Sequence, residues 1–246
     1  MTEKVMTGKR LAEAALNVAN NFKTLYVSGC FGAPLNANNK PRYCSNNAYN
    51  KAPERTAMIK AASSDTFGFD CVCLIKGLLW GWRGDASREY GGACYASNGV
   101  PDIGEDAMIA MCTGVSADFS RIEVGEAVWL PGHIGVYVGD GLAVECTPSW
   151  EDGVQITATA NTGVKPGYNA RKWVKHGKLP WVDYAAQKED DDMTVYRDFK
   201  DVPSYYQAAV KKAVDKGALQ VTGGGLNVSE DLCRTLTVLD RLGKLD

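Results

Sequence analysis

The segment FGFDCVCLIKGLLWGW, residues 67–82, is the feature that most limits how this chain can fold. Its apolar run is far shorter than the roughly 20 residues of a membrane-spanning helix, and Lys76 and Gly77 interrupt it. The segment therefore predicts a helix buried in a protein core and beginning near Cys71. Asp70 is placed to cap this helix, so Cys71 falls in the first turn, where unpaired backbone N–H groups and the helix dipole favour a thiolate. We expect this setting to lower the pKa of Cys71.

The second cysteine of the segment, Cys73, cannot be equivalent to Cys71. Residues that are two positions apart in a helix are rotated by about 200° relative to each other. Cys73 should therefore face the core if Cys71 faces a cleft. The alternative interpretation is that both are ordinary buried core residues. The remaining cysteines are scattered without a CxxC pair, and the chain has only 2 histidines, which argues against a zinc site. No metal or cofactor is expected.

The regions on either side of this helix predict an α+β fold. Residues 8–25 carry apolar side chains at helical spacing behind Thr7, a plausible N-cap. Residues 29–53 are rich in Gly, Pro and Asn, which predicts an irregular wall of a cleft, and a short helix is expected around 105–112. From Glu126 the pattern changes to strands separated by turns: EAVWL, HIGVYVG, LAVECT, VQITATA and ARKWV. Helices followed by an antiparallel meander are typical of α+β proteins.

The chain divides into three parts by composition. Residues 1–186 form the main domain, and residues 187–195 include an acidic run that predicts a solvated linker. Residues 196–246 contain two amphipathic helices, one opened by Pro203 and the other capped by Ser229 and Asn227, with the turn TGGG between them. About 50 residues bury little core alone, so this module should pack on the main domain or on a second copy.

Charge and composition exclude several classes of function. The net charge is −2 and no basic cluster alternates with aromatic residues, so a nucleic-acid partner is not expected. The N-terminus lacks the continuous apolar core of a signal peptide, and no stretch is long enough to span a membrane. With 45% hydrophobic and 23% charged residues, the composition is that of an ordinary globular protein, which we expect to be made in the cytoplasm.

A histidine and a glutamate lie in the segment PGHIGVYVGDGLAVECTPSW, which predicts a hairpin. A two-residue turn at 140–141 would pair Val136 with Glu145 and put His133 and Glu145 on opposite faces. A three-residue loop at 139–141, with a positive φ at Gly141, would pair Gly135 with Glu145 and make Glu145 the diagonal neighbour of His133. A cysteine at a helix start, a histidine and a carboxylate that orients it form an activated nucleophile. The alternatives are a structural histidine and an exposed Glu145 without a role.

These motifs together resemble the NlpC-type papain-like cysteine peptidases of cell-wall hydrolases. FDCVCLIK resembles the family's Asp-Cys helix start, GEAVWLPGHIGVYVGDG its histidine strand, and YVSGCFG from Tyr26 its tyrosine motif. The resemblance implies that Cys71 is the nucleophile, His133 the base, Glu145 the orienting residue and Tyr26 a cleft residue near the oxyanion. Asp70 and Trp129, which lie in the same motifs, are further candidates for substrate contact.

The sequence departs from the family pattern at three places. Cys73 stands where glycine is usual, and Glu145 stands where His, Asn or Gln is common. Gly125 and Glu126 replace the usual Gly-Asp pair. The departure at Glu145 bears on catalysis, because it leaves open how a carboxylate would act at that position.

The resemblance implies a papain-like fold, with N-terminal helices packed on an antiparallel sheet, and a peptidoglycan hydrolase. The expected bond lies between D-glutamate and the next diamino acid of the stem peptide. The tail resembles the C-terminal helical module of endolysins from phages of clostridia-like bacteria, which implies wall binding or dimerisation. We therefore expect a phage lysin that waits in the host cytoplasm until lysis and then acts on the wall. An N-acetylmuramoyl-L-alanine amidase, a papain-like acyltransferase and a non-catalytic wall-binding protein are the alternatives.

Overall fold

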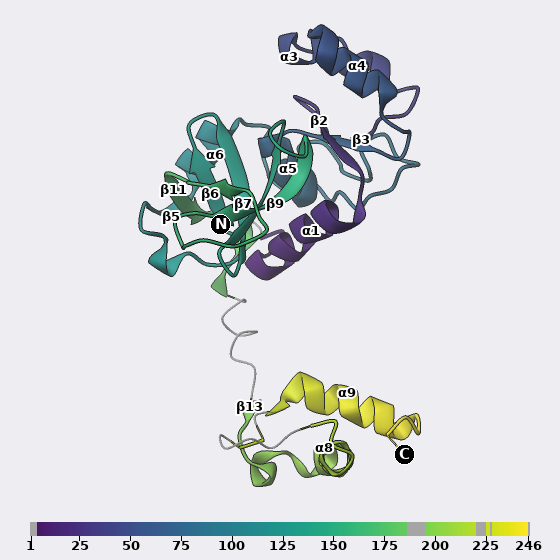
Figure 1. Ribbon diagram of the computed structural model, residues 1–246, viewed down its shortest axis with the longest axis vertical. Coiled ribbons are helices and arrows are strands. Elements are labelled where there is room, and N and C mark those ends of the chain that lie inside the picture. The colour runs from purple at the N-terminus through teal and green to yellow at the C-terminus, as the bar shows by residue number, and fades with distance from the viewer. Residues whose placement is uncertain (1–3, 186–194, 220–224, 227, 246) are drawn as a thin grey trace. The chain divides into compact units, whose positions relative to one another are not determined.

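The chain forms two compact units, Met1–Gln187 and Lys188–Asp246 (Figure 1). The computed structural model describes residues 4–185, 195–219, 225–226 and 228–245. The acidic linker predicted at 187–195 lies outside the described residues except for Val195. Each unit has its own buried apolar core.

A seven-stranded sheet is the centre of the main unit. Its strands are β5 (Thr113–Ser116), β6 (Ala127–Leu130), β7 (His133–Gly139), β8 (Leu142–Thr147), β9 (Gly153–Thr159), β10 (Ala170–Arg171) and β11 (Lys175–Lys178), in the order β10-β9-β8-β7-β6-β11-β5. All neighbours are antiparallel except β10, which pairs with β9 in parallel. The antiparallel meander from β6 to β9 confirms the prediction. The strand predicted at 170–174 is shorter than expected, and β11, with the polar sequence KHGK, has no apolar alternation that would reveal it.

Helices α1 (Gly8–Asn21) and α5 (Cys71–Leu79) contact each other and β7 (Figure 1). The Thr7 side chain accepts a hydrogen bond from the N–H of Arg10, which confirms the predicted N-cap of α1. This helix ends at Asn21 and not at residue 25, because the chain turns into strand β2 (Thr24–Tyr26). Every residue of α5 is buried, Lys76 included, as the prediction of a core helix requires. Helix α6 (Glu105–Met111) confirms the short helix expected there.

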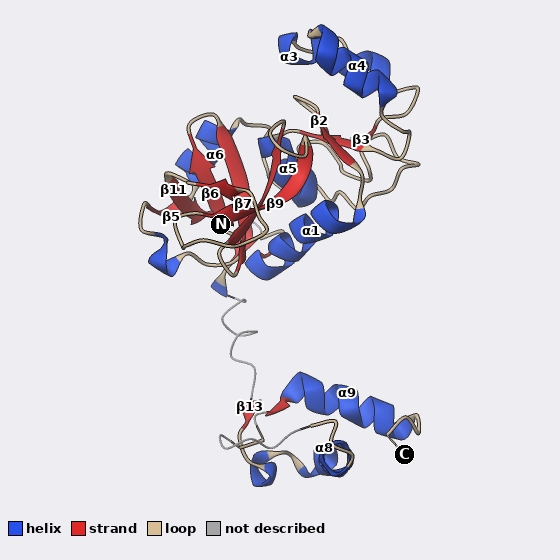
Figure 2. Cartoon of the chain, viewed as in Figure 1, coloured by secondary structure: helices blue, strands red, loops and turns tan. Residues whose placement is uncertain are grey.

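A second sheet of three strands holds the segment that precedes α5. Its order is β2-β4-β3, with β3 at Phe31–Pro34 and β4 at Phe67–Phe69. Helices α3 (Ala48–Lys51) and α4 (Pro53–Ala61) lie beyond this sheet (Figure 2), and α2 (Lys40–Tyr43) precedes them in the chain. The prediction that residues 29–53 lack regular structure is therefore wrong. Pro41 and Pro53 stand in the first turns of their helices, where the missing N–H breaks no helical hydrogen bond.

Smaller elements complete the main unit. A short parallel pair joins β1 (Met6–Thr7) to β12 (Val182–Asp183), and a 3₁₀ turn, η1, spans Phe119–Arg121. None of the helices that the structure describes is both long and apolar enough to cross a membrane.

The β7–β8 hairpin has the register that places His133 and Glu145 on one face. Gly135 lies opposite Glu145, which confirms that prediction. The turn itself differs from the predicted three-residue loop, because Gly139 pairs with Leu142 and only residues 140 and 141 remain between them. Asp140 and Gly141 have φ values of +51° and +71°, as in the tight hairpin turns that favour an Asp-Gly sequence. A bulge between Tyr137 and Gly139 adds one residue to β7. Without it, the two-residue turn would place Val136 opposite Glu145; with it, Gly135 lies opposite Glu145.

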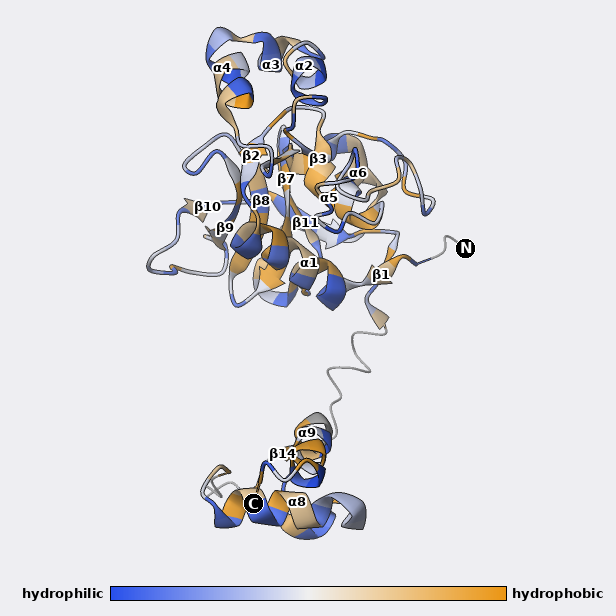
Figure 3. Cartoon of the chain, turned by 90° about the vertical axis from the view of Figure 1, so that its right-hand side faces the viewer, coloured by the Kyte–Doolittle hydropathy of each residue, from blue (hydrophilic) through white to orange (hydrophobic). Residues whose placement is uncertain are grey.

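The C-terminal unit contains the two predicted helices, α8 (Ser204–Asp215) and α9 (Glu230–Arg241). A 3₁₀ turn, η2 (Phe199–Asp201), precedes α8, and β13 (Val195–Tyr196) pairs with β14 (Val228–Ser229). Ser229 caps α9 by accepting a hydrogen bond from the N–H of Leu232, as predicted. Asn227 and most of the TGGG turn lie outside the described residues. Both helices carry apolar and polar residues along their length (Figure 3).

Candidate active site

The start of α5 is held in place by the buried side chain of Asp70. One carboxylate oxygen accepts a hydrogen bond from the N–H of Cys73 at 2.7 Å, which makes Asp70 the N-cap. The other accepts from the N–H of Gly29 at 2.7 Å, in the segment between β2 and β3. Burial raises the pKa of Asp70 despite these two hydrogen bonds. The two bonds join the start of α5 to the connection between β2 and β3.

Cys71 is the first residue of α5 and is only 6% exposed. Burial raises the pKa of its thiol to about 12, and the negative charges of Asp70 and Glu105 act in the same direction. Hydrogen bonds from the backbone N–H groups of Ile134 and Val72 lower it in part. The expectation that the helix start lowers the pKa of Cys71 is therefore wrong, because burial and two nearby carboxylates outweigh the effect of the backbone N–H groups. The N–H of Ile134, the residue that follows His133 in β7, therefore lies near the thiol.

His133 lies at the start of β7 and contacts Glu145 as predicted. Its Nε2 is 2.6 Å from Oε2 of Glu145. The imidazole stacks on the indole of Trp173 with a centroid distance of 5.5 Å and an interplanar angle of 9°. Within the described part of the chain, no hydrogen bond joins His133 to the Cys71 thiol, and Nδ1 of His133 makes none. The ring is thus fixed on one side and leaves Nδ1 available.

Glu145 is fully buried and accepts hydrogen bonds from three side chains. Besides His133, Oγ1 of Thr157 donates at 2.7 Å, and Nε of Arg171 lies 2.9 Å from Oε1 and 2.7 Å from Oε2. Burial acts to raise the pKa of Glu145, but the hydrogen bonds from His133 and Arg171 hold it below its ordinary value. The side chain is therefore a carboxylate at neutral pH, not the exposed residue of the alternative interpretation.

Thr157 and Arg171 were missed by the sequence analysis. Thr157 lies on β9 and Arg171 on β10, in segments that were predicted as strands, but no local rule placed those strands beside Glu145. The hairpin pairing of β8 with β9 would have brought position 157 near Glu145, since Thr157 pairs with Ala143 on the same face.

Gly135 provides the space in which His133, Glu145 and Trp173 meet. A methyl group at this position would lie 2.9 Å from the carbonyl oxygen of Val144 and 3.3 Å from both Cβ of Glu145 and the indole of Trp173. The first of these contacts is closer than packed atoms tolerate. Glycine at position 135 is therefore required by close packing.

Tyr26 lies near Cys71, as the resemblance implied. Burial raises the pKa of its hydroxyl, and the proximity of Cys71 and Asp70 raises it further, so the hydroxyl stays protonated. Its ring meets Tyr49 edge-on at a centroid distance of 5.4 Å. Tyr26 can therefore donate a hydrogen bond near the thiol.

Trp129 contacts residues other than His133 and Glu145. It pairs with Ile134 across β6 and β7, so its side chain lies on the face opposite to that of His133. Its Nε1 donates to Asp106 at 3.0 Å, and Nζ of Lys175 lies 4.4 Å from the ring centroid. The structure thus does not bring Trp129 together with His133 and Glu145.

A cavity of about 700 Å³ lies beside the start of α5. It is lined by parts of the segment 28–42, by the first turns of α5 and by residues 102–105. Cys73 is 5% exposed and belongs to the main buried core, as predicted, and it also borders this cavity. Cys71 lies in the same core and is not among the residues that line the cavity. Inside it, the buried Lys76 pairs with Asp102, which also accepts a hydrogen bond from Tyr95 at 2.8 Å.

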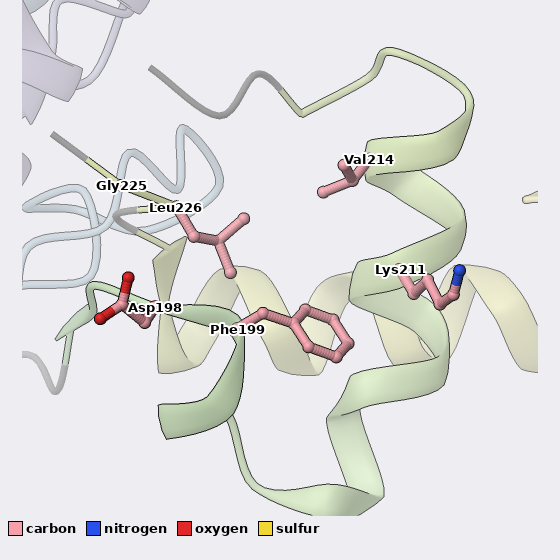
Figure 4. Close-up of a pocket in the computed structure, with 6 residues that line it drawn as sticks. All are labelled: Asp198, Phe199, Lys211, Val214, Gly225 and Leu226. Atoms are coloured by element: carbon pink, nitrogen blue, oxygen red, sulfur yellow. The ribbon is translucent and has the colours of Figure 1, made fainter. Parts of the chain in front are cut away.

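The C-terminal unit has a separate cavity of about 310 Å³ (Figure 4). Phe199, Val214 and Leu226 point toward this space, and Asp198, Lys211 and Gly225 complete the lining. None of these six residues is a cysteine or a histidine, so the cavity contains no Cys-His pair.

Comparisons of the chain with family models, with curated proteins and with solved structures found no match. The relation to the NlpC-type peptidases therefore stays a proposal. It is supported by the sequence motifs, by the position of Cys71 at the start of α5 and by the hydrogen bond between His133 and Glu145.

Replacing Asp70 by alanine should destabilise the main unit. The change removes the cap of α5 and leaves the N–H of Gly29 without an acceptor, so we expect a loss of about 2 to 3 kcal/mol in the free energy of unfolding. Urea denaturation followed by circular dichroism measures it. Asp118→Ala is the matched control, because Asp118 caps only the exposed turn η1, and its loss should be clearly smaller. Equal losses for the two variants would contradict the role given to Asp70.

Proposed function

We propose that the chain is a papain-like cysteine peptidase of the NlpC type that cleaves an amide bond in the stem peptide of peptidoglycan. The observation that supports this most strongly is the hydrogen bond between His133 and the buried carboxylate of Glu145. The backbone N–H of the next residue, Ile134, lowers the pKa of the Cys71 thiol. A thiol, an imidazole and an orienting carboxylate are the groups that nucleophilic amide hydrolysis needs. The expected bond is the one between D-glutamate and the following diamino acid.

The reaction would begin with proton transfer from Cys71 to His133. Because the pKa of the thiol is about 12, the thiolate forms only as Nδ1 of His133 takes the proton during attack on the carbonyl carbon. The N–H of Cys71, for which the described residues supply no acceptor, is free to donate to the oxyanion. His133 then returns the proton to the leaving amine, and a thioester remains. Water, activated by His133, attacks the thioester and releases the acid and the free thiol.

The cavity beside α5 is lined by Asp70 and Val72, the two neighbours of Cys71 in the chain, and would accept part of a polar peptide. Its lining includes Arg42, Lys76, Asp102 and Glu105, so charged groups surround it on several sides.

The C-terminal unit would hold the enzyme on its substrate. The separate core of this unit and its resemblance to endolysin modules support a wall-binding or dimerising role. In this proposal the protein is a phage lysin that accumulates in the host cytoplasm and reaches peptidoglycan at lysis.

Mass spectrometry of muropeptides released from purified walls of known chemistry tests the proposal. New fragments that end in D-glutamate would identify the expected endopeptidase, and free lactyl groups on muramic acid would identify an N-acetylmuramoyl-L-alanine amidase with the same catalytic residues. Intact muropeptides after incubation, with the protein bound to the wall, would instead show a non-catalytic wall-binding protein.

Substitutions at the two neighbouring cysteines should have different effects on wall hydrolysis. Cys71→Ser and His133→Ala should each abolish it without unfolding the protein, because residues that act as a unit fail together. Cys73→Ala should keep most of the activity, because Cys73 lies about 200° around α5 from Cys71 and so cannot take its place in the reaction. Release of soluble muropeptides measures the rate, and circular dichroism confirms folding. If Cys73→Ala is as inactive as Cys71→Ser while folded, Cys71 is not the sole nucleophile.

Deletion of residues 190–246 should separate catalysis from wall binding. The two units have separate cores, so the truncated protein should hydrolyse a small soluble stem peptide at nearly the full rate. Its binding to whole cell walls in a pull-down assay should be weaker, and lysis of whole cells slower. A folded truncated protein that no longer cleaves the small peptide would assign the C-terminal unit to the active site.

A further inference from the structure

Arg171 supplies the positive charge that the buried Glu145 requires. Its guanidinium is bonded to both carboxylate oxygens through Nε, at 2.9 and 2.7 Å. The same group lies 4.8 Å from the ring centroid of Trp150 and 5.7 Å from that of Trp173. Trp173 also stacks on His133, so Arg171 and His133 contact one indole as well as one carboxylate. Arg171 is thus fixed by aromatic rings on one side and by charge on the other.

The groups that face Glu145 differ in what they contribute. Thr157 on β9 is a neutral donor, His133 on β7 carries charge only when protonated, and Arg171 on β10 is always charged. A fully buried carboxylate without a cation is strongly destabilised and takes up a proton instead. Arg171 is therefore the only permanent cation in direct contact with Glu145 among the described residues.

The charge state of Glu145 decides which nitrogen of His133 can act as a base. A carboxylate accepts a hydrogen from Nε2, which leaves the lone pair on Nδ1. A protonated Glu145 would instead donate to Nε2, and the hydrogen of the neutral imidazole would move to Nδ1. In that state Nδ1 could not take the proton of Cys71.

We propose that Arg171 is a positioning residue that keeps Glu145 ionised and thereby holds His133 in the tautomer with a free Nδ1. This inference rests on the proposed function, because it assigns Arg171 a part in the same hydrolysis. It also explains how a glutamate can replace the His, Asn or Gln that the resembling family commonly has at this position: the arginine neutralises the added charge.

The pH dependence of hydrolysis of a soluble stem peptide tests the proposal. In Arg171→Met, Glu145 should take up a proton more readily, so the acid limb of kcat/KM should move upward by about 1 pH unit or more. At neutral pH, kcat should fall by about 10- to 100-fold with little change in KM, because His133 loses its orientation. Arg171→Lys keeps the positive charge, so its acid limb should shift less and its kcat should fall less than in Arg171→Met. An acid limb that stays in place in folded Arg171→Met would overturn the proposal.

The double variant Glu145→Gln with Arg171→Met gives a second and independent test. A neutral amide needs no counter-ion, so adding Arg171→Met to Glu145→Gln should cause little further loss of activity or stability. Lys178→Met is the matched control, because Lys178 forms an ion pair with Glu123 on the same sheet and touches neither His133 nor Glu145. The acid limb of kcat/KM in Lys178→Met should lie at the same pH as in the unaltered protein. If the losses of activity and stability in the double variant equal the sum of those in the two single variants, Arg171 does not act through Glu145.

The same proteins separate this proposal from the proposed function. Unfolding free energies of the two single variants and the double variant form a double-mutant cycle that needs no substrate. If the unaltered protein releases no muropeptides, the proposed function fails, while a coupling between Arg171 and Glu145 in the cycle still stands. If hydrolysis is observed and the cycle shows no coupling, only the role of Arg171 fails.

Discussion

The buried carboxylate of Glu145 is the interaction on which the rest of the site depends. It lies on β8 and accepts hydrogen bonds from β7, β9 and β10, through His133, Thr157 and Arg171. Removing one partner of a buried ion pair leaves an uncompensated charge, at a cost of about 3 to 5 kcal/mol. These four strands are therefore held together at the same point at which the imidazole is oriented. Fold stability and the geometry of the candidate site rest on one side chain.

Backbone features of the hairpin make this arrangement possible. The bulge before Gly139 sets the register, and a slip of one residue would turn Glu145 away from His133. Gly135 then leaves room for the Trp173 indole against the pair. On the other side of the site, Asp70 fixes the start of α5, so that the thiol of Cys71 meets the N–H of Ile134. Both halves of the site are thus positioned by buried polar groups.

The features that could be predicted from the sequence are those that a short stretch of chain determines. The caps at Thr7, Asp70 and Ser229 were found because a helix start is a short-range pattern. The pairing of Gly135 with Glu145 was also predicted, although through a three-residue loop, because the position of a bulge depends on contacts far along the chain. The raised pKa of Cys71, the cavity beside Cys73 and the ion pair of Arg171 were not predicted. Each of these depends on burial by distant segments, which no short stretch of sequence specifies.

The rate at which iodoacetamide alkylates Cys71, located by peptide mass spectrometry, tests most directly whether Cys71 and His133 form one reactive unit. The exposed Cys94 serves as an internal control in the same sample. If His133 withdraws the proton of Cys71, His133→Ala should slow alkylation of Cys71 at neutral pH by about tenfold or more and leave that of Cys94 unchanged. An equal rate at Cys71 in the two proteins, both folded, would show that the thiol reacts without His133 and would contradict the account.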